Sequence, residues 1–184
     1  ITQIHRAYVE AGCNILKVNT FGANVYKFGE ELSDVIHAAF ECARKAVQGE
    51  DVALALDVGP LGKLLQPLGN LDFEEAVQAF GQIVRLGVEN GADLILIETM
   101  NDAYETKAAV LAAKENSTLP VFVTNVYDER GKLMTGADPL AMIAMLEGLR
   151  VDALGMNCSL GPAQMKVLMP EFARYASVPV LVNP

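Results

Sequence analysis

The feature that most constrains the fold is a strict alternation of short apolar segments with longer amphipathic ones along the whole chain. The apolar segments have the length of strands and carry few charges, which is typical of parallel strands covered by helices. The expected strands are Asn14–Val18, Asp51–Leu56, Asp93–Ile97, Pro120–Val123, Val151–Met156 and Val178–Val182. The expected helices are Ile1–Ala11, Leu32–Gln48, Phe73–Asn90, Asp102–Glu115, Asp138–Leu149 and Pro162–Tyr175, and Ala23–Glu31 is expected to be a loop.

This alternation predicts an α/β fold with a parallel sheet, either an open doubly wound sheet or a closed (β/α)8 TIM barrel. The sequence contains neither G-x-G-x-x-G nor the phosphate-binding loop G-x-x-x-x-G-K-[ST], so a nucleotide-binding open sheet is disfavoured. Nearly every expected strand ends in polar residues, which favours a barrel because all strands of a barrel open onto one mouth.

The barrel is expected to be incomplete, with about six β/α units. An eight-stranded barrel typically needs about 250 residues, and this chain has 184. The sequence therefore predicts that residues 1–184 form the central part of one domain, without its first strand and last unit. Internal similarity between VEAGCNILKVNTF, from Val9, and VENGADLILIETM, from Val88, supports a fold built from repeated units.

The composition argues against several classes of function. Hydrophobic residues make up 52% of the chain, which excludes disorder, and a formal net charge of −9 argues against nucleic acid as a partner. No apolar run approaches the roughly 20 residues of a membrane span. The three cysteines, Cys13, Cys42 and Cys158, are too few for a disulfide framework and fit a reducing, cytoplasmic compartment.

Polar residues at the strand ends are the candidates for a functional site. They are Asn19, Thr20, Asp57, Glu98, Thr124, Asn125, Asn157, Cys158, Ser159 and Asn183. No histidine lies among them, since His5 and His37 fall on expected helices away from the mouth. A Cys–His nucleophile pair and a histidine metal site are therefore unsupported.

Cys158 is the most reactive residue of this set, and its chemistry leaves three interpretations open. It is a small buried residue that fills space, a nucleophile, or a thiolate ligand of zinc whose other ligands come from elsewhere. Cys13 precedes a strand and Cys42 lies within a helix, so neither is expected to join Cys158.

Three charged residues near the strand ends have alternative roles as well. Glu98 follows four apolar residues and needs a partner, so it forms a salt bridge at the rim, binds the cationic group of a substrate or acts as a general base. Asp57 precedes Gly-Pro and either caps that loop or lines the site. Lys17 lies within an apolar run and either reaches solvent or lines the site.

Read together, the strand ends resemble the homocysteine S-methyltransferase family, and within it the homocysteine-binding domain of cobalamin-dependent methionine synthases. The segments that carry the resemblance are NTFGAN (Asn19–Asn24), DVGPLGKLLQPLG (Asp57–Gly69), LILIETM (Leu94–Met100), YDERGKLMTG (Tyr127–Gly136), GMNCSLGP (Gly155–Pro162) and VLVNP (Val180–Pro184). They occur in order over essentially the whole chain.

The resemblance implies a (β/α)8 barrel in which zinc, held by three cysteine thiolates, binds homocysteine as a thiolate that is methylated to methionine. Cys158 matches the first of these thiolates, and the other two belong to an adjacent Cys pair that this sequence lacks. Glu98 matches the glutamate that holds the amino group of homocysteine, and we expect Asp57, Asn19, Thr20 and Asn157 to line the substrate site with it.

The resemblance also implies cobalamin- and folate-binding modules as partners, with methylcobalamin, fed by 5-methyltetrahydrofolate, as methyl donor. With one zinc thiolate, these 184 residues are expected to bind no zinc tightly and to be inactive alone. Two alternatives remain open: a methyltransferase that uses betaine or S-methylmethionine, and a non-catalytic barrel remnant.

Overall fold

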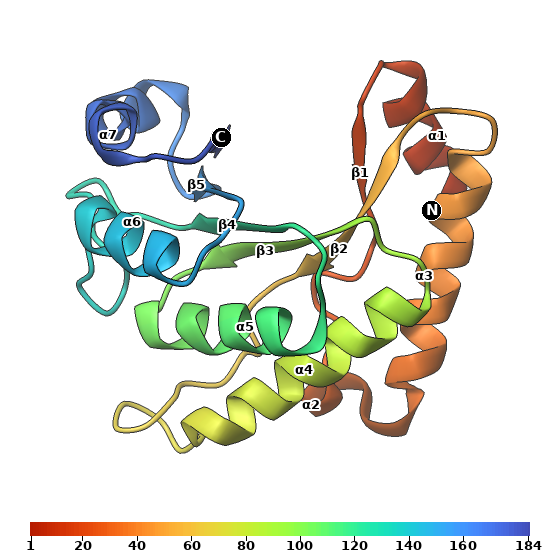
Figure 1. The fold of residues 1–184 in the computed structure, drawn as a ribbon, viewed down its shortest axis with the longest axis horizontal. Coiled ribbons are helices and arrows are strands. Elements are labelled where there is room, and N and C mark those ends of the chain that lie inside the picture. The colour runs from red at the N-terminus through yellow and green to blue at the C-terminus, as the bar shows by residue number, and fades with distance from the viewer.

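The computed structural model describes all of residues 1–184 and contains one sheet of six parallel strands in the order of the chain. The strands are β1 (Ile15–Lys17), β2 (Ala53–Val58), β3 (Leu94–Met100), β4 (Val121–Asn125), β5 (Ala153–Asn157) and β6 (Val180–Asn183). Because each strand pairs only with its neighbours in sequence, the sheet curls in one direction (Figure 1). The result is the expected incomplete barrel, with β1 and β6 as its two edges.

The helices cover the outer, convex face of this sheet (Figure 1). They are α1 (Thr2–Glu10), α2 (Val25–Phe28), α3 (Leu32–Ala46), α4 (Phe73–Glu89), α5 (Ala103–Asn116), α6 (Pro139–Gly148) and α7 (Pro162–Tyr175), with a 3-10 turn at Gly29–Glu31. The six expected helices are all present. All of the helices are too short or too polar to span a membrane.

The expectation of a loop at Ala23–Glu31 was wrong, because this segment forms α2 and the 3-10 turn. The Asn24 side chain accepts a hydrogen bond from the Lys27 N–H and thereby caps α2. The four-residue helix is too short to produce a readable apolar periodicity, which explains why the sequence did not reveal it.

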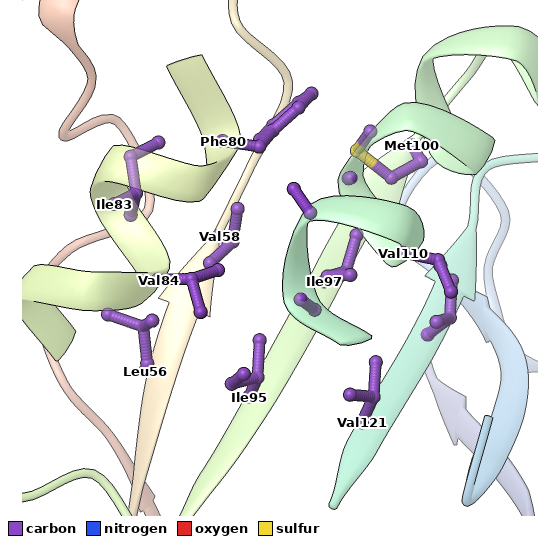
Figure 2. Packing of buried hydrophobic residues seen from close by; sticks show 14 of the residues in the cluster. Leu56, Val58, Phe80, Ile83, Val84, Ile95, Ile97, Met100, Val110 and Val121 are labelled. Atoms are coloured by element: carbon purple, nitrogen blue, oxygen red, sulfur yellow. The ribbon is translucent and has the colours of Figure 1, made fainter. Parts of the chain in front are cut away.

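The main core lies between the outer face of the sheet and the helices α4 and α5. Figure 2 shows alternate strand residues pointing at these helices, namely Leu56, Val58, Ile95, Ile97 and Val121 against Phe80, Ile83, Val84 and Val110. A Cβ atom on Gly87 of α4 would lie 2.4 Å from a methyl carbon of Leu56, so only glycine allows this helix to pack so closely on β2.

Strands β2 to β6 run further at their carboxyl ends than the sequence indicated, whereas β1 ends at Lys17, one residue earlier than expected. Asp57, Glu98 and Asn157 are strand residues and not loop residues. Asp57 and Asn157 remain in register with the next strand, opposite Leu96 and Asn183, while Glu98 lies at the register shift between Ile97 and Met100. A polar side chain does not interrupt the backbone ladder, so the end of an apolar run underestimates the end of a strand.

Candidate active site

Three adjacent strands place charged side chains on the inner, concave face of the sheet. Lys17 of β1 is in register with Ala55 of β2, and Asp57 of β2 is in register with Leu96 of β3, two residues before Glu98. Side chains alternate between the two faces of a strand. Since Leu56 and Ile97 point outward to the helices (Figure 2), Asp57 and Glu98 point inward.

Lys17 and Glu98 form an ion pair that crosses the intervening strand β2. The Lys17 Nζ lies 3.0 Å from Glu98 Oε1 and 3.1 Å from Oε2. The side chain of Glu98 is only 10% exposed, while that of Lys17 is 44% exposed. The small side chain of Ala55, which lies beside Lys17 in the sheet, leaves room for the lysine stem. Glu98 thus has a salt-bridge partner at the rim, and Lys17, which forms that salt bridge, also lines the site.

Asp57 is a second buried carboxyl group beside this pair, and its Oδ1 has no hydrogen-bond partner. Burial, and secondarily the charge of Glu98, raises the pKa of Asp57 to about 8, although the charge of Lys17 opposes this change. The protonated form of Asp57 therefore predominates at neutral pH. An added cation beside Asp57 and Glu98 would favour the carboxylate form.

Thr20, which we expected to contact substrate, is buried and holds β1 to β2. Its hydroxyl donates to the backbone oxygen of Asp57 at 2.8 Å and accepts from the backbone N–H of Asp57 at 3.1 Å. Asn19 is exposed. It lines a cavity of about 280 Å³ along β1 together with Lys17 and Asp57.

His5 of α1 lines the same cavity, although we expected it to lie away from the strand ends. Its Nε2 is buried without a hydrogen-bond partner. Burial, and secondarily the charge of the chain's amino terminus, lowers the pKa of His5. The neutral imidazole is therefore the favoured form at neutral pH.

Asn157 of β5 uses its side-chain amide to fix the end of β3. Its Oδ1 accepts from the backbone N–H of Thr99 at 3.1 Å, and its Nδ2 donates to the Thr99 hydroxyl at 2.8 Å. Thr99 has a φ of 63° at a break in strand register between Ile97 and Met100. Because β4 lies between β3 and β5, this contact connects the residue after Glu98 with the residue before Cys158 across a strand.

Cys158 follows β5 in a tight turn with its side chain exposed. Cys158 and Ser159 have φ values of 59° and 39°, a left-handed conformation that non-glycine residues seldom adopt. The turn is held by the Cys158 N–H, which donates to the Asn183 backbone oxygen at 3.0 Å. The Ser159 hydroxyl also donates, to the backbone oxygen of Tyr127 at 2.7 Å.

One pocket of about 400 Å³ brings most of these features together. Its lining residues are Lys17, Phe21, Glu98, Thr99, Asn157, Cys158, Asn183 and Pro184. The structure therefore places the carboxylate of Glu98 and the thiol of Cys158 in the walls of the same pocket. Thr124 and Asn125 are buried, and Asn125 donates to the Thr106 hydroxyl at 3.1 Å.

Within residues 1–184, Cys158 supplies a single thiolate to any metal. Cys13 lies before β1 and Cys42 lies in α3, and no three His, Cys, Asp or Glu side chains are arranged to hold a metal ion. A structural or catalytic zinc site takes three or four protein ligands. These residues alone do not fit a complete zinc site.

Glu105, near the start of α5, is a buried acid that the sequence analysis did not single out. It accepts a hydrogen bond from the Leu61 N–H at 2.8 Å and so anchors the loop after β2. Burial raises the pKa of Glu105 to about 7 despite this hydrogen bond. An acidic residue in a first helical turn is common, so nothing in the sequence distinguished Glu105.

Comparison with known proteins gives relatives over the whole chain. A family model described as homocysteine S-methyltransferase matches residues 1–184. The methionine synthases of Mycobacterium leprae and Mycobacterium tuberculosis are 32% and 31% identical to it, over 198 and 195 residues respectively. Each alignment covers 98% of this chain but only 16% of the relative, so the chain spans a small part of those proteins.

Solved structures agree on the fold. The metallated form of the homocysteine methyltransferase MmuM from Escherichia coli superposes with a TM-score of 0.84 at 20% identity, and its apo form with 0.82 at 23%. Each match covers 100% of this chain and 70% of that protein. The family model over residues 1–184 and the methionine synthase relatives show that this chain belongs to the homocysteine S-methyltransferase family.

Proposed function

We propose that this chain is the substrate-binding part of an enzyme that methylates homocysteine to methionine. The observation that carries the proposal is that Glu98 and Cys158 line one pocket of about 400 Å³. Homocysteine carries an ammonium group and a thiol. The carboxylate of Glu98 would bind the ammonium group, and a metal ion held in part by the Cys158 thiolate would bind the thiol. Membership of the homocysteine S-methyltransferase family supports the same substrate.

Glu98 is proposed to bind the ammonium group of homocysteine. Its side chain is almost buried, and it already accepts from one ammonium group, that of Lys17. A carboxylate has about four acceptor sites on its two oxygens, so Glu98 has capacity for a second cation. Asp57, with its unpartnered Oδ1, is a further acceptor in the same charged cluster.

Cys158 is proposed to be one ligand of a zinc ion whose remaining ligands lie outside these 184 residues. Bound zinc would supply the deprotonation of the substrate thiol, because the thiolate is the reactive form. The exposed position of Cys158 and the firmly held turn around it suit a ligand that must keep its place when a metal arrives. We infer that residues 1–184 alone bind zinc weakly and have no methyltransferase activity.

The methyl donor is proposed to be methylcobalamin, fed by 5-methyltetrahydrofolate, on other modules of a longer cytoplasmic protein. The methionine synthase relatives, of which the chain covers only 16%, support this arrangement. A methyltransferase that uses betaine or S-methylmethionine is the second candidate. A non-catalytic barrel remnant is the third.

The test is the variant Cys158→Ser in the full-length protein, with Cys42→Ser as a matched control. We expect Cys158→Ser to lose zinc, measured by atomic absorption, together with methyl transfer to homocysteine, while its circular dichroism spectrum is unchanged. Cys42→Ser, on α3, keeps both. Full zinc content and activity in Cys158→Ser would refute the metal role of this residue.

The identity of the donor is tested by assaying the full-length protein with each candidate in turn. We expect methionine formation from methylcobalamin and none from betaine or S-methylmethionine. Activity with S-methylmethionine alone would support the second candidate, and no activity with any donor, despite bound zinc, would support the third.

A further inference from the structure

Lys17 is the one positively charged side chain that lines the pocket shared by Glu98 and Cys158. The other lining residues are acidic, polar or apolar. Lys17 also lines the cavity of about 280 Å³ that contains Asp57, so it stands between the two spaces. An amino-acid substrate that binds in this pocket would bring a carboxylate as well as an ammonium group, and the carboxylate needs a cationic or N–H partner.

The contacts of Lys17 leave its ammonium group able to serve a second anion. An ammonium group has three donors, and the two bonds to Glu98 use only part of that capacity. The lysine side chain is 44% exposed, whereas Glu98 is 10% exposed. The lysine stem is flexible and meets solvent, so it can shift toward a ligand while the carboxylate stays in place.

We propose that Lys17 determines the specificity of this site for zwitterionic amino-acid thiols, by binding the α-carboxylate of the substrate while Glu98 binds the α-ammonium group. This inference rests on the proposed function. The Lys17–Glu98 pair and the two charged groups of an amino acid form a four-charge arrangement in which each charge has an opposite neighbour. A ligand without a carboxylate would leave two cations beside Glu98, which is unfavourable in a partly buried site.

The opposite role is physically possible and gives the opposite result. If Lys17 only occupied the acceptor atoms of Glu98, it would compete with the substrate ammonium group. Its removal would then tighten the binding of every amine, with or without a carboxylate. The experiment below separates these roles by the sign of the change and by its dependence on the ligand.

The experiment measures the dissociation constants of homocysteine and of its decarboxylated analogue, 3-mercaptopropylamine, by calorimetry. It uses the full-length wild-type protein and the variants Lys17→Met, Lys17→Arg and Glu98→Gln. The control is Lys166→Met, on the exposed surface of α7. Thermal melting verifies that each variant folds.

We expect the wild type to bind homocysteine at least about tenfold more tightly than the amine, which is the usual size of a charge-assisted contact. Lys17→Met should weaken homocysteine by about the same factor and leave the amine unchanged or tighter, so that the preference disappears. Lys17→Arg should retain the preference, because a guanidinium group also binds carboxylates, and Lys166→Met should match the wild type.

Two outcomes overturn the inference and are distinguishable from each other. If Glu98→Gln weakens both ligands but Lys17→Met leaves homocysteine unchanged or tighter, the proposed function stands and the role of Lys17 is refuted. If the wild type binds neither ligand, the proposed function fails, and the inference about Lys17 fails with it.

Discussion

The two faces of the curled sheet differ in what their side chains do. On the outer face, Leu56, Ile95 and Ile97 are fully buried against α4 and α5 (Figure 2). On the inner face, alternate residues of the same strands include Asp57 and Glu98, two ionisable groups that are largely buried. Burial of apolar side chains on the outer face stabilises the fold. Burial of ionisable groups on the inner face lowers that stability but leaves those groups available to a ligand.

The largest effect should come from a pair of neighbouring substitutions on β3 that tests this contrast directly. Ile95→Ala, on the outer face, should lower the free energy of unfolding by about 2–5 kcal/mol because it leaves a cavity under the helices. Leu96→Ala, on the inner face and only partly buried, should cost clearly less. Urea denaturation measures both, and equal losses would contradict the assigned difference between the faces.

Asp57→Asn should reveal the cost of the buried inner-face carboxyl group through its pH dependence. The pKa of Asp57 is raised to about 8, so the folded protein keeps a proton that the unfolded chain releases above about pH 4. The wild type therefore loses stability relative to Asp57→Asn as the pH rises from about 4 to 8.

Between pH 5 and pH 7 this difference should grow by about 2–3 kcal/mol, at about 1.4 kcal/mol per pH unit. Urea titrations of both proteins at pH 5, 6 and 7 measure it. A difference that stays constant over this range would mean that Asp57 is ionised in the folded protein.

The contact between Asn157 and Thr99 should account for a smaller effect, localised at the mouth. Asn157→Ala removes two hydrogen bonds that hold Thr99 at its positive φ, and should cost about 1–3 kcal/mol. Asn183→Ala, on the exposed neighbouring strand, is the control and should change stability by less than about 0.5 kcal/mol. If Asn183→Ala lowers the free energy of unfolding as much as Asn157→Ala does, the hydrogen bonds of the Asn157 amide do not account for the effect.

Glu105→Gln should give the smallest effect. It tests whether a buried acid outside the inner face lowers stability with rising pH, as Asp57 does. A glutamine can still accept from the Leu61 N–H. Because the pKa of Glu105 is raised to about 7, the wild type should lose about 1 kcal/mol relative to the variant between pH 5.5 and pH 6.5. Calorimetric melting at the two pH values measures this change, and a wild type that gains stability would reverse the assigned sign.

The sequence predicted the partial barrel because helices and strands leave periodic patterns that are local. The six apolar segments became the six parallel strands, and the six amphipathic segments became helices α1 and α3 to α7. Where an element is too short for a pattern, as in α2, the prediction failed. The placement of Glu98 and Cys158 at one mouth also followed from the alternation, because parallel strands end on the same side.

The sequence alone could not assign partners to these side chains, because the partners are distant along the chain. Lys17 and Glu98 are 81 residues apart and meet only because β1 and β3 lie on either side of β2 in the curled sheet. Thr99 and Asn157 are 58 residues apart and meet across β4. Local chemistry therefore determined which residues stand at the strand ends, and the tertiary structure decided which of them pair, because strand register and sheet curvature set the distances between them.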